Sequence, residues 1–267
     1  MMALGFFATA QSAGAGDTDK DLQRVKQSGD ELAKAGSASF RGTSTQDAGG
    51  PGAKVAFDGA FDFGQRAGEY SASLSAFGVP SEEKVRGLLL DGAIYLGIDA
   101  LRNQPGFEAT PEGIEWLKLD PAILGVSEIA QRDPSVSIDA LRGVTGKVKN
   151  VRSEKVRGVR TSRYHVTLDL QKAVTSAPEG ERERVRASVG ALGSEKIPAD
   201  VWVDTKGRLR KLRLRLEGDL VSNPGSLAFE FSDLGAPFTA TRPAPSAVLD
   251  LGEVLGGATP TTTGASS

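Results

Sequence analysis

The stretch Lys54-Val-Ala-Phe-Asp-Gly-Ala-Phe-Asp-Phe-Gly64 decides the fold class of this 267-residue chain. Val55, Phe57 and Phe61 stand two or four residues apart, with polar or small residues between them. In an extended chain successive side chains point to opposite faces, so this spacing gathers the large apolar groups on one face. The stretch therefore predicts a β-strand with one apolar and one polar face.

The same two-residue period recurs along the chain, in the segments 70–76, 94–98, 164–170, 201–203, 212–216 and 227–231. Turn-forming residues stand between strands at 64–68, 91–92, 157–158 and 204–207. Short turns of this composition join antiparallel strands. Because every apolar strand face needs cover, we expect an α+β fold in which about 8–11 antiparallel strands form one curved sheet, a half-open barrel with helices over its concave apolar face.

Three segments have helical patterns, namely 18–35, 120–141 with a restart at Asp133-Pro134, and 178–192. The first has a narrow apolar face that includes Leu22, Val25 and Leu32, and Asp17 offers an N-cap oxygen. Such helices would cover a sheet rich in Phe and Leu only thinly. Side-chain collapse, additional protein or an apolar ligand could complete the interior, and the pattern leaves these alternatives open.

The ends of the chain differ in composition from the rest. Residues 1–17 resemble the end of a signal peptide, with a small-x-small site at Ala8-Thr9-Ala10 but no basic region before it, and we interpret them as a signal-peptide remnant or flexible N-terminus. Residues 253–267 are rich in Gly, Ser, Thr and Pro and predict a disordered tail. We expect one domain over residues 18–252. The chain has no apolar run of the roughly 18 residues that a membrane-spanning helix needs.

Composition argues against an enzyme. The chain has no Cys, two Met and one His, which leaves few ligands for a metal and no thiolate nucleophile. Alternation places His165 on the polar face of its strand with Arg163 and Thr167, opposite Tyr164. A Ser-His-Asp triad would have to form on that polar face. We therefore expect no catalytic residue, no bound metal and no cofactor.

Basic residues are concentrated in one part of the chain. Residues 147–215 contain 18 Lys and Arg against 8 Asp and Glu, although the net charge of the whole chain is −2. Lys206, Arg208, Lys211, Arg213 and Arg215 form a candidate patch for anionic lipid headgroups. The alternative is a solvated strand face that discourages pairing with other sheets. Aromatic residues are not interleaved with these bases, so we expect no nucleic-acid binding.

The two tryptophans have different expected positions. Trp202 alternates with Val201 and Val203, which places it on the outer face of the sheet. Trp116 precedes a strand-like Leu117-Lys-Leu119 and is expected at the rim of the apolar face. We expect both indole rings to have a structural packing role and not to bind a ligand.

Several segments resemble the actinobacterial LppX/LprG-like lipoproteins, among them Asp133-Pro-Ser-Val-Ser-Ile-Asp-Ala-Leu-Arg-Gly143, Ile197-Pro-Ala-Asp-Val-Trp-Val-Asp204 and Phe231-Ser-Asp-Leu-Gly-Ala-Pro237. The resemblance covers roughly residues 20 to 252. It implies a half-barrel similar to the LolA and LolB carriers, which binds di- or triacylated glycolipids and moves them outward from the plasma membrane. The family's lipobox Cys has no counterpart here, so a lipid anchor is left open.

Together these features predict an extracytoplasmic protein, secreted or associated with the cell envelope, that carries an acyl lipid or glycolipid. We expect a monomer that meets an envelope transport partner and a membrane surface. The alternative is a sensory or scaffolding module that binds a partner protein without carrying lipid. The predicted cleft consists of Val55, Phe57, Phe61, Phe63, Leu74, Ile94, Leu96, Ile98, Val166, Leu168, Leu214 and Phe229.

Overall fold

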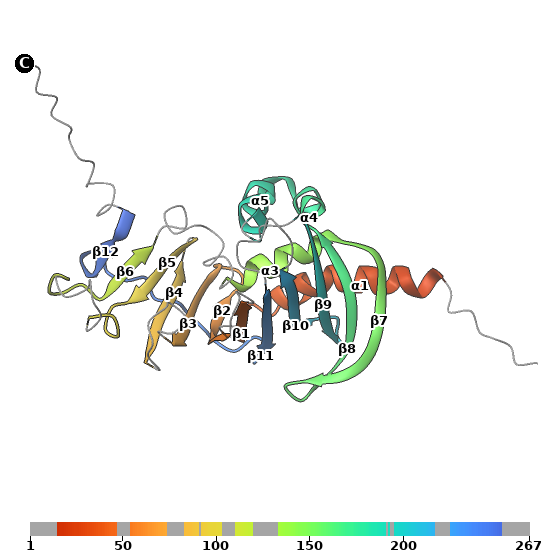
Figure 1. The fold of residues 1–267 in the computed structure, drawn as a ribbon, viewed down its shortest axis with the longest axis horizontal. Helices are drawn as coiled ribbons and strands as arrows, with labels where there is room; N and C mark the ends of the chain where they lie inside the picture. Colours follow the sequence, from red (N-terminus) through yellow and green to blue (C-terminus); the bar gives the residue numbers. More distant parts are fainter. Residues whose placement is uncertain are drawn as a thin grey trace, which may run out of the picture.

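A computed structural model describes residues 15–46, 54–73, 83–90, 92–102, 110–119, 133–190, 192, 195–216 and 225–252. These residues form one 12-stranded sheet in the order β12-β6-β5-β4-β3-β2-β1-β11-β10-β9-β8-β7. Neighbouring strands are antiparallel except β12, which pairs parallel with β6. The sheet is open and strongly curved, with helices on its concave side (Figure 1). The predicted fold class is confirmed, with one strand more than the predicted range.

The sheet has two regions, the wing and the covered half, which differ in the helices that lie over them. The wing consists of β2 (Lys54–Asp62), β3 (Ala67–Ser73), β4 (Lys84–Leu90), β5 (Ala93–Gly97), β6 (Trp116–Leu119) and β12 (Val248–Asp250). The covered half consists of β7 (Val144–Val156), β8 (Val159–Asp169), β9 (Lys196–Asp204), β10 (Leu209–Leu216) and β11 (Gly225–Ser232). Strand β1 (Ser37–Gln46) joins them by pairing with β2 and β11.

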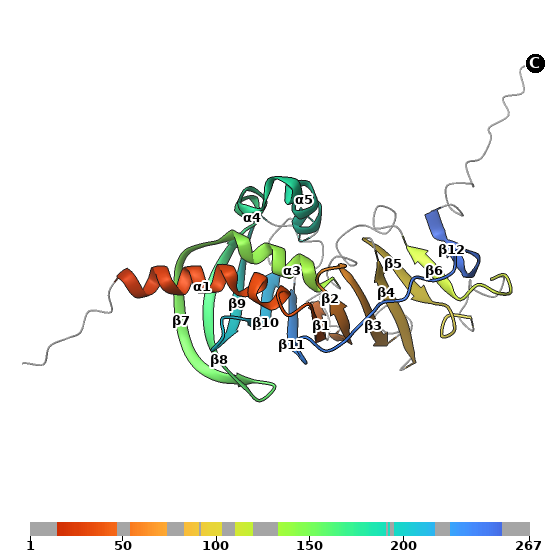
Figure 2. The same ribbon diagram turned by 180° about the vertical axis from the view of Figure 1, so that it is seen from behind.

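The helices lie over the covered half (Figures 1 and 2). They are α1 (Ala15–Ala33), α3 (Pro134–Ala140), α4 (Leu170–Ser176) and α5 (Arg182–Gly190), with short 3-10 turns η2 (Leu141–Gly143), η3 (Glu179–Glu181) and η4 (Pro245–Ala247). Helix α1 packs against β7, β9 and β10, and α4 packs against β8. Of the helices that the structure describes, none lies over β4–β6.

Local sequence explains most of these elements. The four predicted turns join β2 to β3, β4 to β5, β7 to β8 and β9 to β10. In the third turn Gly158 has a φ of 82°, which glycine adopts without steric cost. Asp133 caps α3 as predicted, because its side chain accepts a hydrogen bond from the Ser135 backbone N–H at 2.7 Å.

Some predicted boundaries are wrong or untested. Helix α1 begins three residues before the predicted start and ends two residues before the predicted end. Leu170, which was predicted to continue a strand, begins α4 instead, because Asp169 accepts a hydrogen bond from the Lys172 backbone N–H and caps the helix. Residues 1–14, 120–132 and 253–267 lie outside the described residues, and they contain most of the predicted remnant 1–17, the first part of the predicted helical segment 120–141 and the predicted tail. Residues 15–17 of that remnant belong to α1, and the helix predicted to restart at Asp133-Pro134 is α3.

Aromatic rings lie across glycines of neighbouring strands on the inner face of the sheet. A methyl group added to Gly42 would come within 2.0 Å of the Phe57 ring, and one added to Gly87 would come within 2.1 Å of the Tyr70 ring. Glycine therefore provides the space in which these rings lie flat on the sheet, a device that fixes the register of β-strands.

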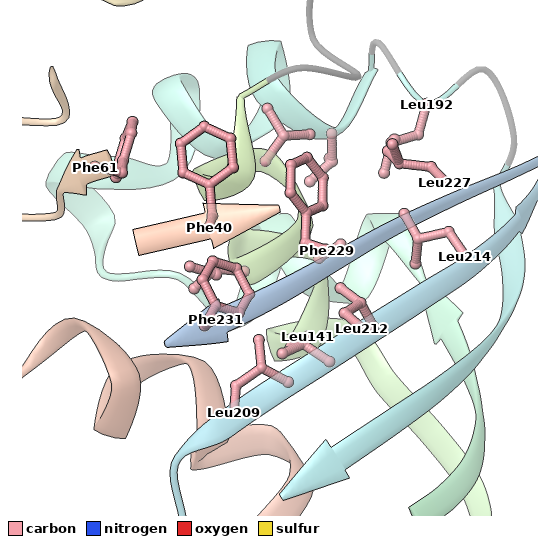
Figure 3. Close-up of a cluster of buried hydrophobic side chains, with 14 of the residues drawn as sticks. Phe40, Phe61, Leu141, Leu192, Leu209, Leu212, Leu214, Leu227, Phe229 and Phe231 are labelled. Carbon is pink, nitrogen blue, oxygen red and sulfur yellow. The ribbon is translucent and has the colours of Figure 1, made fainter. Parts of the chain in front are cut away.

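The main core lies between the concave face and the helices. Phe40, Phe57 and Phe229 meet edge to face, with ring centroids 5.7–6.3 Å apart. Figure 3 shows Leu141 from η2 and Leu192 facing the leucines of β10 and β11. A second, smaller cluster of Ala67, Leu88, Leu90 and Tyr95 lies on the outer face of the wing. The segment 233–247, which we call the strap, leaves β11, crosses the outer face and leads into β12 (Figure 2).

Candidate functional site

The structure brings the described residues of the predicted cleft into one apolar core. Nine of them are buried, namely Phe57, Phe61, Ile94, Leu96, Ile98, Val166, Leu168, Leu214 and Phe229. Val55 and Phe63 are partly buried and pack against this core. Leu74 lies outside the described residues. The residues thus share an inner face, while their contact with a lipid stays a prediction.

These residues divide between the two regions of the sheet. Val166, Leu168 and Leu214 belong to the covered half, where α1 and α4 pack on the strands. Ile94 and Leu96 belong to β5 of the wing. The wing is therefore the part of the predicted cleft in which described helices supply the least cover.

Sequence reasoning missed several residues of the same inner face. Leu96 stands opposite Gly87 of β4 and Leu117 of β6, and Leu117 and Leu119 are buried in the core. Strand β4 was not predicted because Leu88-Leu89-Leu90 has no two-residue alternation. Leu89 faces the inner core while Leu88 and Leu90 face the outer cluster, so both faces of this strand are apolar. The short apolar run Leu88-Leu89-Leu90, directly before the predicted turn at 91–92, is the signal that could have identified β4.

Two cavities lined by described residues lie elsewhere. One, of about 660 Å³, lies on the outer face of the wing under the strap and is lined by residues that include Asp58, Glu69, Arg86, Trp116 and Phe238. The other, of about 930 Å³, lies between α1, β7 and the β9–β10 turn, with a polar lining that includes Asp21, Arg24, Asn150 and Lys206. Neither of these two cavities includes a residue of the predicted cleft.

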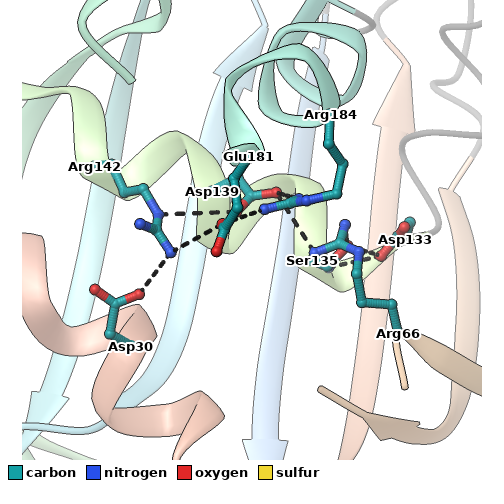
Figure 4. A network of polar contacts seen from close by, with 8 residues as sticks. All are labelled: Asp30, Arg66, Asp133, Ser135, Asp139, Arg142, Glu181 and Arg184. Atoms are coloured by element: carbon teal, nitrogen blue, oxygen red, sulfur yellow. Dashed lines mark hydrogen bonds and ion pairs between the residues drawn. The ribbon is translucent and has the colours of Figure 1, made fainter. Parts of the chain in front are cut away.

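A network of charged side chains joins the helices to the wing (Figure 4). Its centre is Asp139 of α3, whose side chain is only 4% exposed. The Arg184 guanidinium of α5 lies 2.6 Å from the Asp139 carboxylate, and that of Arg66, in the β2–β3 turn, lies 3.7 Å away. Arg142 reaches Asp139 at 3.9 Å and Asp30 of α1 at 3.0 Å. One buried carboxylate therefore connects α3 and α5 to the wing and, through Arg142, to α1.

Asp133 lies next to this network and has a perturbed pKa. Desolvation by burial raises the pKa of its carboxyl group, and the hydrogen bond from Ser135 and the charge of Arg66 act in the opposite direction. Arg66 also donates a hydrogen bond to the Ser135 hydroxyl at 2.5 Å. We assign these groups to holding the helices on the sheet, because their contacts are with one another.

The predicted basic patch is divided between two places. Lys211, Arg213 and Arg215 lie on the outer face of β10, on the opposite side from Leu212 and Leu214. Arg208 instead turns to Asp204, with its Nη2 3.0 Å from the carboxylate, and Lys206 lines the cavity beside α1. A headgroup role for either group is untested.

His165, Trp202 and Trp116 all lie on the outer face of the sheet. His165 contacts the buried carboxylate of Asp200 through Nδ1. Trp202 packs on the outer face as predicted. Trp116 was expected at the rim of the inner face, but it packs against the outer cluster and lines the cavity under the strap, because the register places Leu117 on the inner face.

The described ranges contain neither a cluster of metal ligands nor a helix that could span a membrane. Those residues contain no group of three or more His, Asp or Glu side chains placed to hold a metal ion. None of the helices described is both long and apolar enough to cross a membrane.

Comparison with known proteins supports the fold. No family model matches the chain. An uncharacterised 31.2 kDa protein from the rplA–rplJ intergenic region of Streptomyces griseus is 30% identical over 138 residues, which are 50% of this chain and 44% of that protein. The chain therefore spans less than half the length of this curated relative.

Two solved structures share the architecture. The lipoprotein LppX of Mycobacterium tuberculosis aligns with a TM-score of 0.51 and 15% identity, over 84% of this chain and 99% of LppX. LprF of Mycobacterium bovis aligns with a TM-score of 0.50 and 14% identity, over 85% of this chain and 98% of LprF. The chain has the fold of these proteins, so the resemblance inferred from its sequence is confirmed at the level of the fold.

Proposed function

We propose that this chain is an extracytoplasmic lipid-binding protein that holds an acyl chain against the inner face of its wing. The observation that carries the proposal is the continuous apolar inner face, which runs from Leu117 and Leu96 in the wing to Leu214 and Leu168 in the covered half. The described helices lie over only one end of that face. An apolar sheet surface of this extent is suited to an acyl chain, because lipid pockets are lined mostly by apolar side chains.

The energetics favour a long acyl chain over a small apolar ligand. Each buried methylene contributes about 0.8 kcal/mol, so ten of them contribute about 8 kcal/mol. Association itself costs an estimated 4–15 kcal/mol in lost freedom, which a short ligand would not offset. Contact along several strands therefore suits a di- or triacylated lipid, with its polar part outside the apolar interior.

The cellular role follows from the same proposal. The protein carries an acylated lipid or glycolipid between the plasma membrane and the outer envelope, as a monomer that passes its ligand to an envelope transport partner. The fold it shares with the lipoproteins LppX and LprF supports an envelope location. The position of His165, paired with Asp200 on the outer face, supports binding without catalysis, since this imidazole lies on the side of the sheet opposite the apolar core.

One observation favours a second function, namely a sensory or scaffolding module that binds a partner protein. Phe40, Phe57 and Phe229 are each buried and pack edge to face, as side chains do in an interior that needs no ligand. In this alternative, the apolar face is core throughout and the outer surface makes the functional contacts.

Lipid analysis of the native protein separates these functions. The full chain is purified from its own host without detergent, extracted with organic solvent and examined by mass spectrometry. The proposal predicts about one equivalent of an acyl lipid per chain and uptake of a fluorescent fatty-acyl probe after delipidation. Protein without stoichiometric lipid that also fails to bind the probe would favour the partner-binding module.

A further inference from the structure

Basic side chains form two rows across the outer face of the covered half. Strand register aligns Arg152 of β7, Arg163 of β8, Trp202 of β9 and Lys211 of β10 in one row. A parallel row aligns Lys149, His165, Asp200 and Arg213 on the same four strands. Adjacent strands are about 4.8 Å apart, so each row brings three basic side chains close together around Trp202 in one row and around Asp200 in the other.

Trp202 fixes two of these cations. The Arg163 guanidinium lies 5.0 Å from the centre of the indole ring, and the Lys211 ammonium lies 5.2 Å from it. The indole Nε1–H donates a hydrogen bond to Glu154 at 2.5 Å. Cation–π contacts of this kind hold long side chains in place. Binding a partner therefore costs less side-chain entropy, because these side chains are already ordered.

The acid at the centre of the array lies beneath the bases. The side chain of Asp200 is only 2% exposed, and its carboxylate contacts Arg163 at 3.1 Å, Arg215 at 4.0 Å and His165. Lys149 and Arg213 are exposed and make no ion pair with any residue that the structure describes. Two further acids on this face, Glu154 and Glu230, are each 29% exposed and pair with Arg152 at 3.2 Å and with Lys211 at 2.7 Å. The face stays net positive, because its six Lys and Arg side chains outnumber Asp200, Glu154 and Glu230.

The β7–β8 hairpin extends the positive surface to the end of the sheet. Residues 144–169 contain seven Lys and Arg against two Asp and Glu. Strand β7 is the last strand of the sheet as described, and its Val151 is 38% exposed, the one large apolar side chain exposed within the described ranges. An apolar side chain among exposed cations is a combination suited to the boundary between water and lipid headgroups.

We propose that Lys149, Arg152, Arg163, Lys211, Arg213 and Arg215, which we call the outer basic face, dock the protein on an anionic phospholipid surface. Docking brings the protein to the membrane that would supply its lipid, so it extends the proposed function but is measured separately from lipid uptake. Positive charges near an anionic leaflet gain energy individually, so an array of them on an open sheet face needs no complementary pocket.

A nucleic acid fits this face less well than a membrane does. Binding of single strands relies on aromatic rings on which bases stack. The Trp202 ring is buried and already contacts two cations, so it does not offer a free stacking surface. The chemistry therefore favours dispersed phosphate headgroups.

The test is co-sedimentation of the full chain with vesicles of phosphatidylcholine, with and without phosphatidylglycerol. We expect binding only to the anionic vesicles, and we expect it to fall as salt is raised. The double variant Lys149→Glu and Arg213→Glu should bind at least about 30-fold more weakly, since each basic residue near an anionic surface strengthens binding about fivefold and the introduced carboxylates are repelled by the anionic lipid. Both side chains are exposed, and melting curves check that the variant folds.

The matched control is Lys172→Glu with Arg186→Glu, which changes the net charge equally on helices α4 and α5, at exposed positions on the opposite side of the sheet. It should bind anionic vesicles as the parent does. The proposal would be overturned if both variants lost affinity for anionic vesicles equally, or if neither lost it. It would also be overturned if the parent bound neutral vesicles equally well, or bound a DNA duplex more tightly than vesicles. Acyl-probe uptake, measured on the same samples, should be unchanged in both variants, and its absence in the parent would count against lipid binding rather than docking.

Discussion

The covered half and the wing use one sheet in different ways. In the covered half, helices close the inner face and the outer face carries ordered charges around Trp202 and Asp200. In the wing, described helices leave β4–β6 without cover on the inner face, while the strap covers an apolar cluster on the outer face. Inner-face side chains are buried in both regions, as Leu214 and Leu96 show, so the regions differ in which elements lie over them. In the proposed function the covered half supplies rigidity and the wing supplies the surface that the acyl chain contacts.

The largest expected effect comes from removing equivalent side chains from the two regions. Leu214 in the covered half is 0% exposed and Leu96 in the wing is 4% exposed. We expect Leu214→Ala to lower the free energy of unfolding by about 4 kcal/mol, because close-packed helices cannot collapse into the cavity. Leu96→Ala should lower it by only about 2 kcal/mol in delipidated protein. Urea unfolding measures both values, and equal losses would remove the energetic distinction between the regions.

The connection between the regions should give the next effect. Asp139→Asn leaves the guanidinium groups of Arg66, Arg142 and Arg184 without their shared carboxylate. We expect a loss of about 3 kcal/mol, at the lower end of the range for a broken buried ion pair, because the three guanidiniums are partly exposed. The control Glu181→Gln removes a more exposed carboxylate and should cost less than about 1 kcal/mol. Similar unfolding curves for both variants would show that the network does not hold the regions together.

The strap offers a smaller effect that belongs to the wing alone. Leu88 is buried in the outer cluster that Ala240 and Val248 also contact. Leu88→Ala should lower stability by about 2 kcal/mol and speed hydrogen exchange at the amides of β6 and β12 more than at those of β8. Ser71→Ala, in the wall of the neighbouring cavity, serves as the control and should change neither. Uniform acceleration over all strands would mean that the strap stabilises the whole sheet.

The smallest expected effect is a pH dependence that belongs to the covered half. Burial tends to raise the pKa of Asp204, but hydrogen bonds from the Arg210 side chain and from the Arg208 and Lys206 backbone outweigh it, so the pKa is lowered. A carboxyl group whose pKa is lowered by folding stabilises the folded protein at pH values above its pKa in the unfolded chain, which is about 4. This stability is lost as the pH falls through the pKa of the group in the folded protein.

Asp204→Asn should therefore show a shallower loss of stability below about pH 4 than the parent does. The measurement is urea unfolding at a series of acidic pH values. Glu195→Gln is the control, since Glu195 is exposed. Parallel stability curves for the parent and Asp204→Asn would contradict the contribution assigned to this carboxylate.

Much of this architecture follows from alternation alone. The spacing of Phe57 and Phe61 predicts a one-faced strand, and the four turns predict antiparallel pairing, because both depend on residues close in sequence. Strand β7 escaped prediction because register shifts between Thr145 and Lys149 and between Asn150 and Arg152 interrupt its period. Bulges of this kind are not visible in an alternation pattern.

The candidate sites depend on long-range pairing that sequence does not show. The basic patch predicted at 206–215 comes from one hairpin. In the structure, Lys211 and Arg213 of β10 share a face with Lys149 and Arg152 of β7. Trp116 was placed on the wrong face because its segment is short and its register is set by β5. Alternation identifies which residues share a face, and only the strand order shows which faces become a site.

The central claim is that an acyl chain lies against the inner face of the wing, and substitution of Leu96 tests it most directly. Leu96→Trp adds bulk on that face at an expected cost of about 1–3 kcal/mol. Thr167→Trp places the same indole on the outer face of β8, at an exposed position. The measurement is uptake of a fluorescent fatty-acyl probe by delipidated protein, well below the Tm of each variant. The account predicts loss of uptake in Leu96→Trp and parent-like uptake in Thr167→Trp, and parent-like uptake by a folded Leu96→Trp would contradict it.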